Sequence, residues 1–238
     1  MAVDTDATNF ELRLALDLGS SKTACGAQLA VVGEDPDPAK TVIVELEDGH
    51  RCVPSIMGFV RRGDSFLFRW GHDFRKRLRD GSLVGVEHFV FENVKVCLIP
   101  SPWQHERRQT VQQELDRLAS ARGSRDQLTP QWLLECYLSQ IRKTVDRQIR
   151  KVYPARLREQ LTGAQRRWTL MVPEQAAGPP TKVFSDMAPR AGFPNVTLVS
   201  EAETAAAFRL REYVLQTPAV SDIFEVQIAP LFDHWGYG

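Results

Sequence analysis

The stretch Leu14-Ala-Leu-Asp-Leu-Gly-Ser-Ser-Lys-Thr-Ala24 decides how the start of this 238-residue chain folds. An alternating apolar run leads into the carboxylate of Asp17, and Gly19 and a series of small hydroxyl side chains follow. This order is typical of a strand, a tight turn and a second strand, so we predict a hairpin formed by segments 12–18 and 24–32. Residues 17–23, at the tip of that hairpin, contain the polar groups that could bind a ligand.

The residue types at the hairpin tip suit a phosphate group and a metal ion. A carboxylate at a strand end, as at Asp17, can hold a divalent cation such as Mg²⁺ through water. Gly19 lets the backbone approach a phosphate closely. Hydroxyl and ammonium groups follow at Ser20, Ser21, Lys22 and Thr23. Ordinary hairpin turns have a similar composition, and a P-loop is excluded because its earlier glycine is missing and a strand follows.

The rest of the chain predicts an α/β domain. A third strand at 41–46 and an extended segment at 52–60 continue an antiparallel meander, and a further extended segment is expected at 89–98. A helix begins after Thr129, which can cap it, with Pro130 at its first position. Strand, helix, strand and helix patterns then follow, at 167–173, 181–191, 196–199 and 201–214. We therefore predict a mixed five-stranded sheet, three antiparallel strands followed by two parallel ones, with flanking helices.

Composition and charge exclude several classes of protein. Thirty basic and thirty acidic residues cancel, so global charge favours neither nucleic-acid nor membrane binding. No apolar run is as long as a membrane span, and the N-terminus lacks the basic start and apolar core of a secretory signal. We therefore expect a cytoplasmic protein with reduced cysteines and no nucleic-acid or membrane partner. The histidines and cysteines lack the spacing of metal ligands.

Five stretches of the chain, taken in order, resemble the heat shock protein 70 family of the actin-like ATPase superfamily, and in particular its divergent eukaryotic branch. The hairpin tip resembles the first phosphate motif of that superfamily. The other stretches are Val53-Pro54-Ser55, Phe68-Arg-Trp-Gly-His72, Phe91-Glu-Asn-Val-Lys95 and the pair Leu170-Met-Val-Pro173 and Leu198-Val-Ser-Glu-Ala-Glu-Thr-Ala-Ala-Ala207. Ala202 replaces the proline that the family usually has after the glutamate.

The resemblance implies one lobe of an actin-like, ribonuclease H-like ATPase domain that binds ATP or ADP with Mg²⁺. Asp17 would bind the Mg²⁺ through water, and Ser20 and Ser21 would contact the β- and γ-phosphates. The other residues implied to lie at the nucleotide are Gly19, Lys22, Thr23 and Pro173, the last as a conformational relay beside the cleft.

The resemblance also implies a catalytic set. Lys95 would orient the attacking water and stabilise charge on the γ-phosphoryl group. Glu201 would help to hold the water shell of the metal that Asp17 binds.

The family has a second lobe with another phosphate hairpin, and segment 215–238 has no glycine pair to form one. We therefore divide the chain into a flexible N-terminal lead (1–10), a first lobe (11–214) and an atypical tail (215–238). Phosphoryl transfer needs contacts from several sides. We expect a truncated, chaperone-like relative of heat shock protein 70 whose ATP binding and hydrolysis are weak or lost.

Other interpretations of the sequence stay open. A face that the family covers with a returning helix would be left apolar, or covered by 223–235, and would favour self-association or a protein partner. The chain would then be a non-catalytic protein-interaction module, or an inert truncated product. A sugar-kinase-like member of the superfamily shares the Asp-x-Gly start, but the substrate-loop aspartate and second lobe that it needs are not found.

Overall fold

The predicted hairpin forms the centre of the main sheet in the computed structural model, which describes residues 10–35, 37, 40–98, 104–172, 179–193, 196–202 and 204. β1 (Phe10–Leu18) pairs antiparallel with β2 (Lys22–Val31), so that Leu18 lies opposite Thr23. Alternate side chains of β1 are buried, and Leu12, Leu14, Leu16 and Leu18 all belong to the core. The four leucines on one face of β1 therefore pack into the core and hold the hairpin in place, as the alternation predicts.

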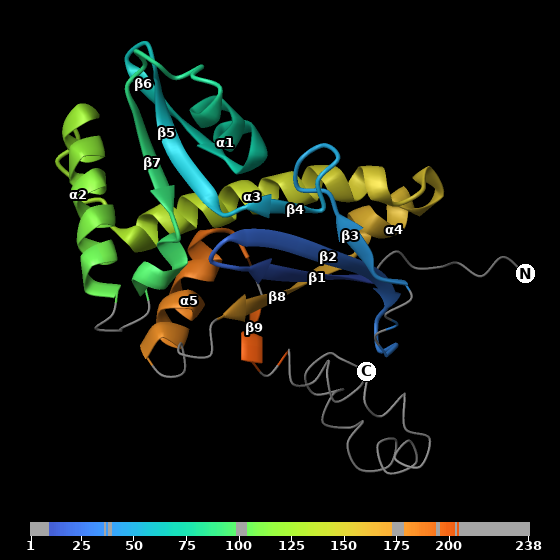
Figure 1. The fold of residues 1–238 in the computed structure, drawn as a ribbon. Helices are drawn as coiled ribbons and strands as arrows, with labels where there is room; N and C mark the ends of the chain where they lie inside the picture. Colours follow the sequence, from blue (N-terminus) through green and yellow to red (C-terminus); the bar gives the residue numbers. More distant parts are fainter. Residues whose placement is uncertain are drawn as a thin grey trace, which may run out of the picture.

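The main sheet is mixed, and its strand order is β3–β2–β1–β8–β9 (Figure 1). The other strands in this order are β3 (Val42–Val44), β8 (Gln165–Val172) and β9 (Val196–Ser200). β1, β2 and β3 pair antiparallel, whereas β1, β8 and β9 pair parallel. The predicted α/β class and the order of three antiparallel and two parallel strands are confirmed.

The predicted number of strands was wrong, because a sixth strand joins the main sheet and a second sheet follows it. β4 (Cys52–Pro54) pairs with the start of β2. The segment 52–60, predicted as one extended run, divides at Ser55. Beyond it, β5 (Ile56–Arg62) pairs with β6 (Ser65–Trp70) and β7 (His88–Glu92) in a separate antiparallel sheet. β4 ends at Pro54, and the N–H of Ser55 still donates to the Ser21 carbonyl oxygen at 2.9 Å.

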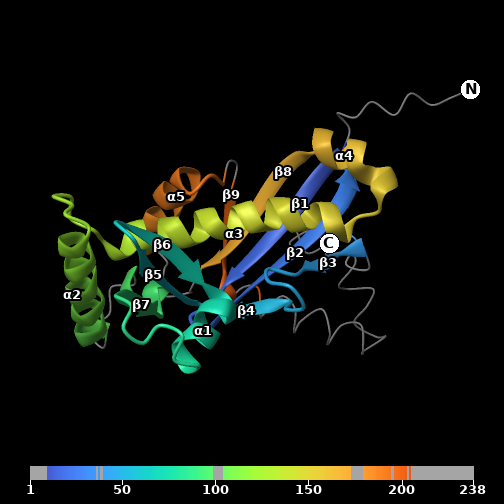
Figure 2. The ribbon, with the colours of Figure 1, turned by 90° about the horizontal axis from the view of Figure 1, so that it is seen from above.

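The long helix α3 (Pro130–Val152) runs along one face of the main sheet and contacts α5 (Pro179–Arg190) (Figure 2). Its start is as predicted, because the Thr129 hydroxyl oxygen accepts a hydrogen bond from the Trp132 N–H at 3.1 Å. Trp168 of β8 packs edge to face against Phe193, with ring centroids 4.6 Å apart. The other helices are α1 (Gly71–Arg79), α2 (His105–Ala121) and α4 (Arg158–Gly163).

The opposite face of the main sheet is less buried within the described part of the chain. Register places Ala24, Asp17, Met171 and Val199 in one row across β2, β1, β8 and β9. Asp17 is exposed and the other three are partly exposed. The residues that would decide whether an apolar surface remains uncovered, 223–235 among them, lie outside the described residues.

Among the predicted domain boundaries, the one at residue 11 lies within the described residues. β1 begins at Phe10, one residue before the predicted start of the lobe. Residues 1–9, the tail 215–238 and most of the helix predicted at 201–214 lie outside the described residues, although residues 201, 202 and 204 are helical. Among the described helices, none combines the length and the apolar character needed to span a bilayer.

Gly58 of β5 lies where the second sheet packs most tightly. An added Cβ would collide with the carbonyl oxygen of Phe89 and lie 2.6 Å from the ring of Phe74. We expect Gly58→Ala to lower the free energy of unfolding by about 2 kcal/mol, because a backbone atom cannot move aside without disturbing the pairing of β5 and β7.

Gly26→Ala in β2 is the matched control, since the nearest atom to its added Cβ, on Thr41, lies at 3.6 Å. Urea denaturation measures both variants, and equal stabilities would contradict the packing around β5.

Candidate functional site

The carboxyl ends of three parallel strands meet at one edge of the main sheet. β1, β8 and β9 end at Leu18, Val172 and Ser200, and the register places Asp17 beside Met171. In open α/β sheets, ligands bind at the carboxyl ends of the strands. The hairpin tip therefore lies at the edge of the sheet that is suited to a binding site.

Lys95 reaches this edge from a short 3₁₀ helix (Val94–Leu98). The extended conformation predicted for 89–98 is therefore wrong beyond Glu92, where β7 ends. The chain turns at Asn93, whose φ is 55°. The valine-rich, apolar composition of residues 94–98 resembles a strand, and it hid this turn from sequence reasoning.

The ammonium of Lys95 joins the end of β1 to the residue that follows β9. Its Nζ donates hydrogen bonds to the Leu18 carbonyl oxygen and to Oε1 of Glu201. The Lys95 side chain is 3% exposed, whereas that of Glu201 is 40% exposed. A buried ammonium is tolerated only where such partners replace water. The structure thus brings together two predicted catalytic residues that are 106 positions apart in the sequence.

Asp17 lies close enough to this pair to interact with both charges. Burial by the surrounding protein raises the pKa of its carboxyl group above the ordinary value, the Lys95 ammonium lowers that pKa, and the Glu201 carboxylate raises it. No group of three or more His, Cys, Asp or Glu side chains in the described part of the chain is placed to hold a metal ion. Asp17 and Glu201 offer two carboxylates at this edge, and carboxylate oxygens are ligands that Mg²⁺ accepts.

The loop between β1 and β2 offers its backbone to an anion. Ser20, Ser21 and Lys22 are exposed. No described group accepts a hydrogen bond from the N–H of Ser20 or Ser21, and such free amides in a turn can bind a phosphate. A Cβ at Gly19 would lie 2.5 Å from the carbonyl oxygen of Lys22. Glycine is therefore required at this position by the tightness of the turn.

A chain of buried hydroxyl groups holds the loop in place. Tyr137 of α3 donates to Oγ1 of Thr23 at 3.0 Å, and Oγ of Ser55 donates to the Gly19 carbonyl oxygen at 2.8 Å. The Thr23 and Ser55 hydroxyls are 2.9 Å apart, so Thr23 completes the chain by donating to Ser55. The N–H of Ser55 also donates to the Ser21 carbonyl oxygen at 2.9 Å. The loop is thus held on its buried side by side chains from α3, from β2 and from the residue that follows β4.

This arrangement gives Thr23 a different task from the one that the resemblance implies. Thr23 is fully buried, and its hydroxyl is already engaged by Tyr137 and Ser55. Sequence reasoning identified Ser55 only as part of a motif and Tyr137 only as part of the apolar stripe of α3. The alternation along β2 contains a signal for Thr23, because its partner Leu18 faces the core. Pro173 lies outside the described residues.

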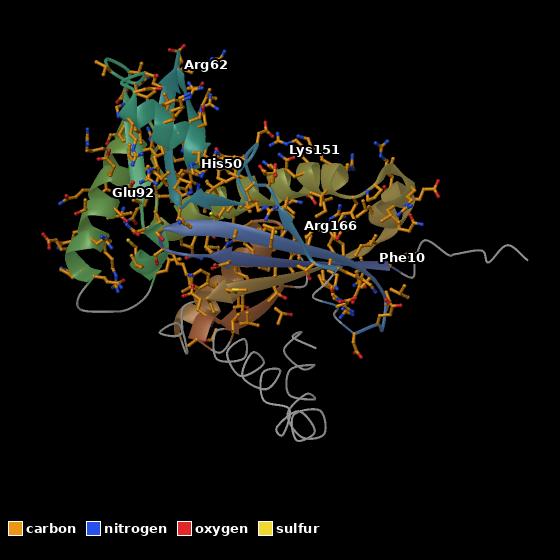
Figure 3. The ribbon with its side chains drawn as sticks, turned by 45° about the vertical axis from the view of Figure 1, so that its right-hand side comes forward. Phe10, His50, Arg62, Glu92, Lys151 and Arg166 are labelled. Carbon is orange, nitrogen blue, oxygen red and sulfur yellow. The ribbon has the colours of Figure 1, made fainter. Side chains whose placement is uncertain are left out.

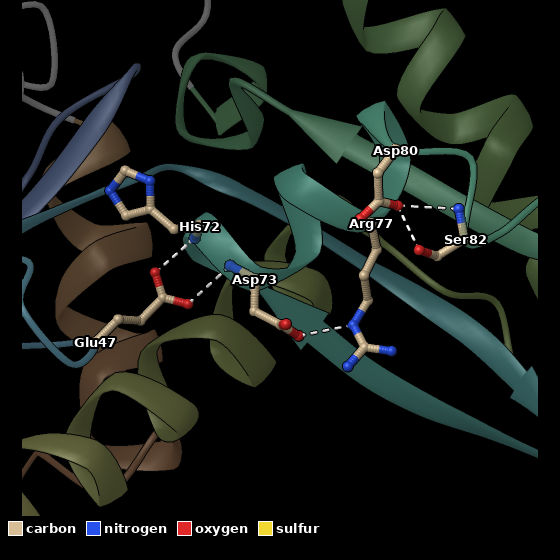
Figure 4. Close-up of polar contacts among 6 residues, drawn as sticks. All are labelled: Glu47, His72, Asp73, Arg77, Asp80 and Ser82. Carbon is tan, nitrogen blue, oxygen red and sulfur yellow. Dashed lines mark hydrogen bonds and ion pairs between the residues drawn. The ribbon is translucent and has the colours of Figure 1, made fainter.

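A second polar feature lies at the start of α1 (Figure 4). The Glu47 carboxylate accepts hydrogen bonds from the N–H groups of His72 at 2.5 Å and of Asp73 at 3.2 Å. It thereby satisfies free amides at the helix N-terminus and interacts favourably with the helix dipole. Gly71 has a φ of 73°, and a Cβ there would lie 2.6 Å from Oε2 of Glu47. Sequence reasoning did not identify Glu47, because its partners are about 25 residues away in the chain.

Comparison with known proteins adds no assignment. No family model matches the chain, and no curated protein matches it. The functional assignment therefore rests on the geometry of the hairpin tip and of the residues that reach it.

The hydrogen bond between Tyr137 and Thr23 can be tested by a double-mutant cycle. We expect Tyr137→Phe to lower the free energy of unfolding by about 1 kcal/mol, because the buried Thr23 oxygen loses its donor. Thr23→Val should also destabilise, because it leaves the Tyr137 hydroxyl buried without an acceptor. The double variant should cost less than the two single variants together. Strictly additive costs in urea denaturation would contradict a direct bond.

The raised pKa of Asp17 predicts a pH-dependent cost in stability. The folded protein binds the Asp17 proton more tightly than the unfolded chain does, so ionised Asp17 destabilises the fold at neutral pH. We expect Asp17→Asn to raise the thermal midpoint at about pH 7, and this gain to vanish below about pH 3.9, the ordinary pKa of aspartate.

Asp80→Asn is the control with the opposite sign. Hydrogen bonds from Ser82 lower the pKa of Asp80, so its ionised form stabilises the fold at neutral pH and the variant should lose stability there. A gain for both variants, or for neither, would refute the assigned electrostatics of Asp17.

Proposed function

We propose that this chain is the first lobe of an actin-like ATPase domain related to heat shock protein 70, and that its hairpin tip binds the phosphates of ATP or ADP with Mg²⁺. One observation carries the proposal. The buried Lys95 ammonium contacts both the end of β1 and Glu201 at the carboxyl edge of the parallel strands. A cation buried beside a loop of free amides is an arrangement that functional sites favour and that ordinary hairpins do not need.

The residues at the tip have complementary tasks in this proposal. The N–H groups and hydroxyls of Ser20 and Ser21 bind phosphate oxygens, and the exposed ammonium of Lys22 adds positive charge. Asp17 and Glu201 orient the water molecules around Mg²⁺, which neutralises charge on the phosphates when it is bound. Lys95 stabilises charge on the γ-phosphoryl group and orients the attacking water.

The contact between Lys95 and Glu201 limits how strongly the tip binds a nucleotide. The ammonium is engaged by a carboxylate and a carbonyl oxygen, so a phosphate must compete with both for its hydrogen bonds. Ser20, Ser21 and Lys22 lie in water, where each electrostatic contact contributes less than in a closed cleft. We therefore propose weak nucleotide binding and negligible hydrolysis by this chain alone.

Isothermal titration calorimetry with ATP and ADP, in the presence and absence of Mg²⁺, tests the proposal. We expect Mg²⁺-dependent binding with a dissociation constant on the order of 1 mM. Lys95→Met and Asp17→Asn should abolish it, and Glu201→Gln should alter its dependence on Mg²⁺. Lys143→Met is the matched control, because Lys143 is exposed on α3 and should leave binding unchanged.

Circular dichroism of each variant confirms that it is folded before titration. Binding that Lys95→Met leaves intact, or no binding of either nucleotide by the folded wild-type chain, would refute the proposed phosphate site. Rapid phosphate release that depends on Lys95 would refute only the expectation of negligible hydrolysis.

A further inference from the structure

A cleft of about 840 Å³ lies between α1, α3 and the loop that joins β3 to β4. Figure 3 shows His50, in that loop, on the side of the molecule where α1 and α3 lie. Each helix contributes one stripe of side chains at spacings of three and four residues, which places them on one face. The stripe of α1 is His72, Arg75, Lys76 and Arg79, and that of α3 is Gln140, Thr144, Arg147 and Gln148. No residue of the hairpin tip lines this cleft.

Four cations line the cleft without an ion pair to any described carboxylate. Three of them, Arg75, Lys76 and Arg79, belong to α1, and Arg147 belongs to α3. The dipole of α1 accounts for basic residues near its C-terminal end. It does not account for Arg147, which comes from a different helix and faces the same space.

Four carboxylates line the same cleft, and each of them also has a partner outside this set of cations. They are Glu47, Asp48, Asp73 and Asp80. Figure 4 shows three of them held by the amides at the start of α1, by the Arg77 guanidinium at 2.9 Å and by the Ser82 N–H at 3.0 Å. Asp48 lies 3.9 Å from Lys151. The charged side chains of the cleft without a hydrogen bond or ion pair to a described residue are therefore the bases, and the carboxylates reduce the net positive charge around them.

The buried wall of the cleft also holds unused polar groups. Thr144 is 1% exposed, and its hydroxyl has no hydrogen-bond partner in the described part of the chain. A helical threonine commonly bonds the carbonyl oxygen four residues earlier, so the unpaired hydroxyl is unusual. The Gln148 side chain is 6% exposed and forms no hydrogen bond with a described residue. Both side chains lie on the stripe that α3 presents to the cleft.

The rim adds a flat polar surface. The rings of His50 and His72 stack with centroids 3.9 Å apart and an interplanar angle of 23°. Nε2 of His72 lies 3.2 Å from the Cys52 carbonyl oxygen, which fixes the ring at the mouth of the cleft. The cleft thus combines a basic wall, a polar floor and an aromatic rim.

We propose that this cleft binds a small anion that carries a phosphate group. Arg147 and the basic stripe of α1 contact the phosphate oxygens, and Thr144 and Gln148 donate hydrogen bonds from the floor. Arginine suits this task because its planar guanidinium can donate two parallel hydrogen bonds to a phosphate. The volume lies within the range of about 300–1,000 Å³ that is common for small-molecule sites.

Titration calorimetry of the full chain with inorganic pyrophosphate, without Mg²⁺, tests this site. We expect saturable binding of one anion per chain that weakens as salt is added. Arg147→Gln should weaken it at least tenfold. Arg150→Gln is the matched control, because Arg150 is an exposed base on the same helix that does not line the cleft.

Two further variants separate this site from structural effects and from the hairpin tip. Thr144→Val should weaken pyrophosphate binding without lowering the thermal midpoint, because it removes an unpaired buried hydroxyl. Lys95→Met should leave pyrophosphate binding unchanged, so that this site and the proposed nucleotide site succeed or fail separately. Co-sedimentation with vesicles that carry phosphoinositide headgroups distinguishes a lipid phosphate from a free one.

Each outcome decides the proposal. Binding of either probe that depends on Arg147 and not on Arg150 supports it. Equal losses in the Arg147→Gln and Arg150→Gln variants would show non-specific attraction and overturn it. The same holds if neither pyrophosphate nor the vesicles bind the folded chain.

Discussion

The burial of the Lys95 ammonium is the constraint on which the geometry of the sheet edge depends. A charge removed from water must find partners in the protein, and Lys95 finds them in Leu18 at the end of β1 and in Glu201 after β9. Strands that are neighbours only through β8 are thereby tied together at their carboxyl ends. The same pair of residues acts on the pKa of Asp17 in opposite directions, because the Lys95 ammonium lowers that pKa and the Glu201 carboxylate raises it. A substitution of Lys95 would therefore affect both the contact between β1 and Glu201 and the pKa of Asp17.

Local sequence signals predicted the parts of the fold that neighbouring residues determine. Thr129 and Pro130 start α3 because capping and a fixed φ act within one turn, and the alternation along β1 buries its leucines as expected. The second sheet was missed because alternation shows that a segment is extended but not which strand it pairs with. Lys95 was assigned to an extended segment because the apolar, valine-rich composition around it resembles a strand. Glu47 was missed because a helix cap that comes from another loop leaves no local pattern.

In the candidate site, too, the residue types could be read from the local sequence, whereas the direction of each side chain depends on strand pairing. The composition of residues 17–23 indicated a loop for phosphates, and the structure exposes Ser20, Ser21 and Lys22 there. It also directs Thr23 inward, where its hydroxyl belongs to a chain that ends at the Gly19 carbonyl oxygen. A residue type therefore indicates what chemistry is available, whereas strand register decides which side of the sheet receives it. The uneven burial of the two sheet faces follows from that register.

Ser55 occupies the point at which the chain leaves the main sheet and enters the second one. Its side chain and its N–H hold the Gly19–Ser21 loop, and the next residue already pairs with β7. A rotation of the second sheet about this point would pull directly on the loop through two hydrogen bonds. The orientation of the second sheet and the shape of the turn between β1 and β2 are thus coupled through Ser55.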